Sequence, residues 1–190
     1  MLPLSLVANM PKKPKKSVVE VARELRRYTL DAFEFLHRGL DYTVQREHGP
    51  PDPILSKLSD WMEKQGLDLT ELQALLDRED VPPVIAAAIE HFGGPIGLTQ
   101  KLNRHVGGAA LCYGLRDFAV SQWGYMAPAV LRSWGIRSTS DFGRMVFALV
   151  EAGLLQKLPD DRIQDFDKVY DFDTAFADAY KISITDPAAS

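Results

Sequence analysis

The 190-residue chain has the composition of an average soluble globular protein, with 46% hydrophobic and 25% charged residues and a formal net charge of −4. This balance excludes a wholly disordered or fibrous chain, and no apolar run approaches the roughly 20 residues that a membrane span needs. The single cysteine, Cys112, excludes an intramolecular disulfide and a cysteine-rich zinc site. We therefore expect one folded unit in a reducing compartment, the cytoplasm, without a membrane anchor.

Residues 1–17 predict a flexible basic arm, because prolines interrupt its lysines and forbid a helix. The apolar residues of this arm precede its basic ones, which is the reverse of the order in a secretory signal. Met10 stands directly before the segment PKKPKK, so a translation start at Met10 is a hypothesis that mass spectrometry of the native protein would decide.

Residues 18–46 carry apolar side chains at three- and four-residue steps, which predicts one long amphipathic helix or two helices end to end. Thr29 and Asp31 are the candidate N-caps of a second helix. The segment EHGPPDP then ends the helical pattern. Further short helices are expected in a helical insertion at about residues 47–103, one ending at Gly66 and another entered by Pro82 and Pro83.

Beyond the insertion, the pattern predicts three short helices over 109–123, 126–134 and 141–152, followed by a β-hairpin over 154–172 and a last helix from Asp173. This order is typical of a winged helix. The expected fold is therefore mainly α: a compact helical domain over residues 18–180 with a short C-terminal β-hairpin, winged-helix-like in its C-terminal half, before a flexible tail over 181–190.

The tripeptide DFG at residues 141–143 is the metal-binding signature of protein kinases, which also need a glycine-rich loop, a strand lysine and an HRD loop. None of these is present. We interpret Asp141 instead as a negative charge at the positive end of a helix, with Ser138, Thr139 or Ser140 as the N-cap and Phe142 as the first buried residue.

No other motif predicts catalysis or a metal site. The four histidines lack metal-ligand spacing, and the aspartates of DDRIQDFDKVYDFD lack the spacing of an EF-hand. His105 and Cys112 are seven residues apart, and we favour a hydrogen-bonded histidine and a buried cysteine over a reactive pair. We assign no catalytic, cofactor-binding or metal residue and expect no cofactor, although an enzyme with a site assembled from distant residues stays an alternative.

Two functions fit this pattern. The first is a non-enzymatic domain that docks a protein partner or a second copy of itself; its candidate contact residues are Trp61, Trp123, Tyr125 and Trp134. The alternative is a factor that associates with nucleic acid or the ribosome, for which the candidate phosphate-binding residues are Lys12, Lys13, Lys15, Lys16, Arg23, Arg26 and Arg27. The expected recognition helix offers only Arg144 and the expected wing is acidic, which disfavours winged-helix binding to DNA.

The segment from Arg104 to Phe176, which contains RHVGG and STSDFGRMVFALVEAGLLQK, resembles the core of an uncharacterised bacterial family. That family is known from Planctomycetes, Verrucomicrobia and Acidobacteria and is named after a hypothetical Methylacidiphilum infernorum protein; Tyr28 to Val44 resembles its first helix. The resemblance implies no activity, cofactor or catalytic residue. Two departures are the insertion at 47–103 and Gly107, where the family pattern has Ser or Thr, the better N-cap residues.

Overall fold

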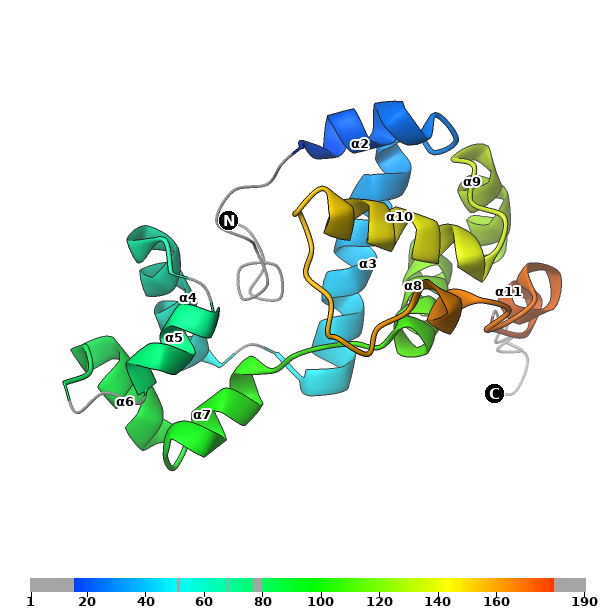
Figure 1. The fold of residues 1–190 in the computed structure, drawn as a ribbon. Coiled ribbons are helices and arrows are strands. Elements are labelled where there is room, and N and C mark those ends of the chain that lie inside the picture. The colour runs from blue at the N-terminus through cyan, green and yellow to red at the C-terminus, as the bar shows by residue number, and fades with distance from the viewer. Residues whose placement is uncertain (1–15, 51, 68, 77–79, 180–190) are drawn as a thin grey trace, which may run out of the picture.

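The computed structural model describes residues 16–50, 52–67, 69–76 and 80–179, and throughout these ranges the regular elements are helices (Figure 1). The α-helices are α2 (Val18–Leu25), α3 (Leu30–His48), α4 (Pro53–Gln65), α5 (Leu69–Leu76), α6 (Pro83–His91), α7 (Pro95–Leu102), α8 (Gly108–Trp123), α9 (Ala127–Ser133), α10 (Thr139–Glu151) and α11 (Phe172–Ala179). Two short 3₁₀ helices complete the set, η1 (Gly124–Met126) and η2 (Ile163–Phe166).

The first amphipathic stretch is two helices. Ser17 caps α2, since its hydroxyl accepts from the Glu20 amide while the Glu20 carboxylate accepts from the Ser17 amide at 2.7 Å. Arg26 ends α2 in the left-handed region, with φ of 51°. Thr29 then occupies the N-cap position of α3, and Asp31 lies in its first turn. The chain direction changes here, which lets α2 lie across the end of α3 (Figure 1).

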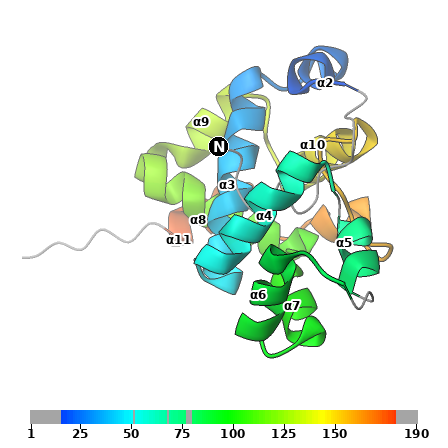
Figure 2. The same ribbon diagram turned by 90° about the vertical axis from the view of Figure 1, so that its left-hand side faces the viewer.

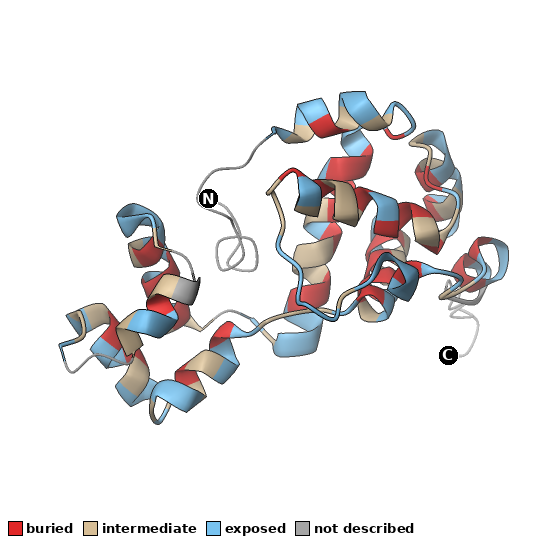
Figure 3. Ribbon diagram, viewed as in Figure 1, coloured by how far each residue is buried: buried red, intermediate tan, exposed pale blue. Residues whose placement is uncertain are grey.

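The main core lies between α3, α8 and α10, where buried residues face one another (Figure 3). Helices α3 and α8 cross closely because each has a glycine at the contact. A Cβ atom on Gly39 would overlap Leu115, and one on Gly114 would overlap Thr43. Phe35 on α3 is the centre of an aromatic group; its ring contacts those of Phe118, Trp123, Trp134 and Phe142.

Helices α4 to α7 lie in the segment that we interpret as an insertion, and they have a hydrophobic cluster of their own, with Leu58, Ile85 and Leu98 fully buried in it. Figures 1 and 2 show these helices gathered to one side of α3. Asp52 caps α4 by accepting from the Ile54 amide, and its other carboxylate oxygen lies 3.1 Å from His91 Nε2 on α6. The insertion therefore packs on its own residues.

The predicted β-hairpin over 154–172 is wrong, because no strand is present in the described residues of that segment. Its apolar residues Phe166, Val169 and Tyr170 are spaced by three and four, which is a helical rather than an alternating pattern. The Asp165 carboxylate accepts from the Arg162 amide at 2.8 Å and so begins η2. Without a hairpin there is no wing, and the winged-helix comparison fails with it. The helical part of the prediction agrees with the structure.

The predicted basic arm lies almost wholly outside the described residues, and so does the predicted tail at 181–190. Lys12, Lys13 and Lys15 belong to this undescribed part.

Candidate functional site

An apolar cavity of about 530 Å³ runs along α3. Six parts of the chain line it: the start of α2, the length of α3, residues 104–111, the second half of α10, the end of η2, and the segment 153–162 that follows α10. We call this last segment the strap. Figure 1 shows the strap descending beside α3 after the end of α10. We call the space that these segments line the α3 cavity.

The floor of the α3 cavity is a stripe of apolar side chains on one face of α3, which includes Leu30, Phe33, Leu40 and Val44. These positions recur at steps close to multiples of 3.6 residues, so they lie above one another along the helix. From Leu30 to Val44 the helix advances by about 21 Å at 1.5 Å per residue. The cavity is therefore elongated along α3.

The opposite wall comes from α10 and the strap. It consists of Val146 and Phe147 on α10 and Leu154 and Leu155 on the strap, all of them half-buried. Phe166 closes one side, because it packs where α8 and α10 each have a glycine. A Cβ on Gly108 would come within 2.7 Å of the Phe166 ring, and one on Gly143 within 2.8 Å of Phe166 Cβ.

Polar groups gather where the cavity meets residues 104–106. His105 Nε2 lies 3.0 Å from Asp161 Oδ1 on the strap. The other Asp161 oxygen accepts from the Leu158 amide at 2.6 Å. The contact between His105 and Asp161 therefore joins the strap to the segment that precedes α8.

Arg104 lines the same end of the cavity. Its guanidinium donates to the carbonyl of Gly49, just beyond the end of α3, while its buried Nε atom has no hydrogen-bond partner among the described residues. Burial lowers the pKa of the Arg104 guanidinium because it disfavours the charged form. His48 Nε2 lies 3.0 Å from the carbonyl of His105, so the two ends of the insertion are held together beside the cavity.

The predicted contact aromatics lie in different places. Trp123 and Trp134 pack edge to face at 5.3 Å and are half-buried against the main core. Trp61 packs against the separate cluster of the insertion. Tyr125 is 72% exposed, and Met126 beside it is 59% exposed. Of the four, Tyr125 alone presents most of its side chain to solvent.

The predicted phosphate-binding residues that the structure describes are mixed in their contacts. Arg23 and Arg26 are exposed on and just after α2. Arg27 forms an ion pair with the buried Asp141 at 3.1 Å, and Lys16 pairs with Glu24 at 2.7 Å. These contacts do not show that Arg23, Arg26 and Arg27 share one surface.

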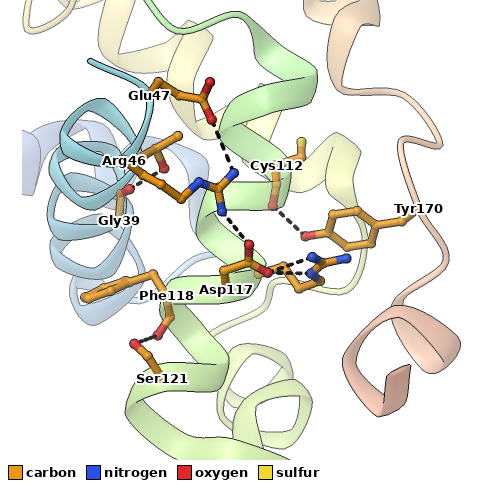
Figure 4. A network of polar contacts seen from close by, with 10 residues as sticks. Gly39, Arg46, Glu47, Cys112, Asp117, Phe118, Ser121 and Tyr170 are labelled. Carbon is orange, nitrogen blue, oxygen red and sulfur yellow. Dashed lines mark hydrogen bonds and ion pairs between the residues drawn. The ribbon is translucent and has the colours of Figure 1, made fainter. Parts of the chain in front are cut away.

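Cys112 and the polar contacts near it lie outside the lining of the α3 cavity. Cys112 is fully buried, and burial raises the pKa of its thiol to about 12. Figure 4 shows the Tyr170 hydroxyl donating to the Cys112 carbonyl, at 2.9 Å, and Arg46 of α3 paired with Asp117 of α8. Around this network no group of three metal-ligating side chains converges in the described part of the chain.

None of the helices within the described residues combines the length and apolar character that crossing a bilayer requires.

Comparison with protein-family models, with curated proteins and with solved structures finds no match to this chain. The family resemblance of residues 104–176 therefore stays a prediction.

Sequence reasoning missed the α3 cavity and the place of Arg104 in it. The stripe on α3 is visible in the sequence, but it has the spacing of any core-facing helix, so it carries no signal for a cavity.

Proposed function

We propose that this chain is a non-enzymatic binding domain and that the α3 cavity is its binding site for an apolar ligand. The observation that carries the proposal is an apolar space of about 530 Å³ lined by six parts of the chain. Small-molecule sites in proteins typically have volumes of about 300–1,000 Å³, mostly apolar walls and a few polar groups that orient the ligand. The α3 cavity has these three properties.

A neutral apolar fluorophore such as 1-aminoanthracene tests the proposal. We expect saturable binding at one site, which Val146→Trp abolishes by filling the cavity between α10 and α3. The matched control is Val19→Trp, because Val19 is 42% exposed on α2 and does not line the cavity. Absent or non-saturable binding to the wild-type chain, or equal binding to Val146→Trp, would contradict the proposal.

A second candidate function is docking of a protein partner or a second copy of the chain, and the exposed pair Tyr125 and Met126 favours it. Aromatic and methionine side chains are enriched in interfaces. Chemical crosslinking of native lysate tests this function: Tyr125→Ser should remove a crosslinked partner, while Tyr113→Ser, on the exposed side of α8, should not. An uncrosslinked monomer would count against it.

The nucleic-acid alternative rests on the basic arm with Arg23 and Arg26. It predicts that nuclease treatment of a lysate shifts the chain on a density gradient. An unchanged position would contradict it.

A further inference from the structure

The shape of the α3 cavity selects the kind of ligand. Its lining follows α3 from Leu30 to Val44, a distance of about 21 Å along the helix axis. A long apolar chain laid along α3 can contact this whole stripe, whereas a compact ligand would contact only part of it.

The walls also favour an alkyl chain over an extended peptide. A peptide brings a backbone N–H and C=O with each residue, and a buried group of this kind needs a hydrogen-bond partner. The floor and the opposite wall are apolar from Phe33 to Val44 on α3 and from Val146 to Leu155 across from it. Glu34 and His37 line the cavity too, but Glu34 is exposed and His37 half-buried, which places them at the rim.

At the polar end of the cavity, a ligand group that accepts hydrogen bonds fits better than one that donates them. The Asp161 carboxylate is already engaged by His105 and the Leu158 amide, and Asp165 accepts from the Arg162 amide. By contrast, the Arg104 guanidinium lines this end of the cavity, and its hydrogen bond to the Gly49 carbonyl uses one of its five N–H donors. An anionic ligand oxygen can pair with this cation. Arginine is also the side chain best suited to carboxylate recognition.

We propose that the α3 cavity binds a free long-chain fatty acid, with its carboxylate at Arg104 and its alkyl chain running along α3 toward Leu30. This inference rests on the proposed function of the cavity. An extended chain advances about 1.2 Å per bond, since three backbone bonds of a polypeptide span about 3.3–3.6 Å. The 21 Å between Leu30 and Val44 therefore corresponds to about 17 bonds, the length of a fatty acid of about 17 carbons when its C–O bond is counted.

The experiment measures binding to the full chain by isothermal titration calorimetry, with each probe below its micellar concentration. Three probes share one tail: dodecanoate, dodecanol and dodecyltrimethylammonium. We expect dodecanoate to bind tightest and the ammonium compound weakest. Octanoate tests the tail, because each methylene removed should weaken binding about fourfold, the equivalent of about 0.8 kcal/mol.

Arg104→Met tests the head group. It should weaken dodecanoate by about tenfold or more, as expected for a lost charge-assisted hydrogen bond, and leave dodecanol unchanged. Lys101→Met is the matched control, because Lys101 is an exposed cation on α7 away from the cavity. Circular dichroism shows whether Arg104→Met folds; if it does not, the three probes on the wild-type chain decide.

The outcomes separate the two proposals. If none of the tailed probes binds, the proposed function fails and this inference fails with it. If dodecanol binds as tightly as dodecanoate, or if Arg104→Met weakens both probes equally, the cavity is an apolar site and only the fatty-acid inference is overturned.

Discussion

The Tyr28 hydroxyl donates a 2.8 Å hydrogen bond to Oδ1 of Asp141, which joins the turn before α3 to the first turn of α10 across 113 residues of sequence. Asp141 is fully buried, and its carboxylate also accepts from the backbone amides of Arg137 and Ser138 at 2.9 and 3.0 Å. Arg27 and Arg144 approach it as ion pairs at 3.1 and 2.9 Å. Asp141, the aspartate of the DFG tripeptide, is thus a structural anchor: its buried carboxylate is bound by side chains and backbone amides of the protein.

Asp141→Asn should therefore destabilise the fold. The amide presents a donor where a carboxylate oxygen now accepts, and it leaves the two arginines without their charge partner. We expect a loss of about 2–4 kcal/mol in the free energy of unfolding, measured in urea, because a buried and multiply bonded charge is disrupted. Ser140→Ala is the control: Ser140 bonds the exposed Asp167, so a loss under about 1 kcal/mol is expected. Equal losses for the two variants would contradict the anchor role.

The same carboxylate predicts a pH dependence. Burial alone would raise the pKa of Asp141, but hydrogen bonds from Arg137 and Tyr28 and the charge of Arg27 outweigh burial, so the pKa is lowered. A carboxyl whose pKa is lower in the folded state contributes its full stability above the unfolded pKa of about 3.9 and loses it as the pH falls through the folded value. The stability difference between wild type and Asp141→Asn should be constant from pH 7 to 5 and shrink below pH 4. A difference that is the same at pH 3 and pH 7 would be inconsistent with this linkage.

Cys112 should be an unreactive thiol in the folded chain. It is fully buried on α8, and burial raises its pKa to about 12, so very little thiolate exists at pH 8. Labelling with Ellman's reagent should be slow in buffer and fast in 8 M urea. Leu111→Ala tests whether labelling requires unfolding. This change creates a cavity beside Cys112 and lowers the stability, so it should speed labelling by promoting unfolding. Rapid labelling of the native chain would show that the thiol is accessible.

Local sequence signals predicted several helix ends. Gly66 ends α4 in the left-handed region, and Pro83 is the first residue of α6, because glycine and proline have backbone preferences that act without tertiary context. The sequence likewise predicts the start of α10 with Asp141 in its first turn; of its three candidate N-caps, Ser138 holds that position in the structure. The hairpin prediction for 154–172 is wrong because it rests on the turn residues of this segment alone, whereas Phe166 packs inward against Gly108 and Gly143.

The candidate site could not be predicted from the sequence, and the reason is different. Its walls come from residues as distant as Val18, Val44 and Leu155, and no local pattern links them. Arg104 appears in the sequence as one arginine among many; only its burial beside Gly49 distinguishes it. Trp123 is half-buried against the main core, whereas Tyr125, two residues later, is 72% exposed, so composition alone could not separate core from surface.

Gly107 offers a stabilising change. It is the N-cap of α8 with an extended backbone, φ of −67° and ψ of 158°, and an added Cβ would meet no atom within 4 Å. Gly107→Ser should raise the stability by a few tenths of a kcal/mol, because its hydroxyl can accept from an amide in the first turn. Thermal unfolding measures the gain. Gly108→Ser, one residue on, should instead destabilise, since its Cβ would overlap Phe166.

Gly114 tests the closest approach of α3 and α8. On an isolated helix, Gly114→Ala would stabilise by up to about 1 kcal/mol, because alanine has the higher helix propensity. In the fold, the new Cβ would overlap Oγ1 and Cγ2 of Thr43, and the helices must separate, which typically costs about 1–3 kcal/mol. The steric effect should win, so urea unfolding should show a net loss.

A double-mutant cycle separates the overlap from other effects of Gly114→Ala. Thr43→Ala removes the obstructing atoms, together with the 2.6 Å hydrogen bond from the Thr43 hydroxyl to the Gly39 carbonyl within α3. If the overlap is the cause, Gly114→Ala should be harmful in the wild type and neutral or stabilising beside Thr43→Ala, with a coupling above about 0.5 kcal/mol. Additive losses would mean that Gly114 matters for a reason other than its contact with Thr43. Helices α3 and α8 would then tolerate a wider spacing than their glycines indicate.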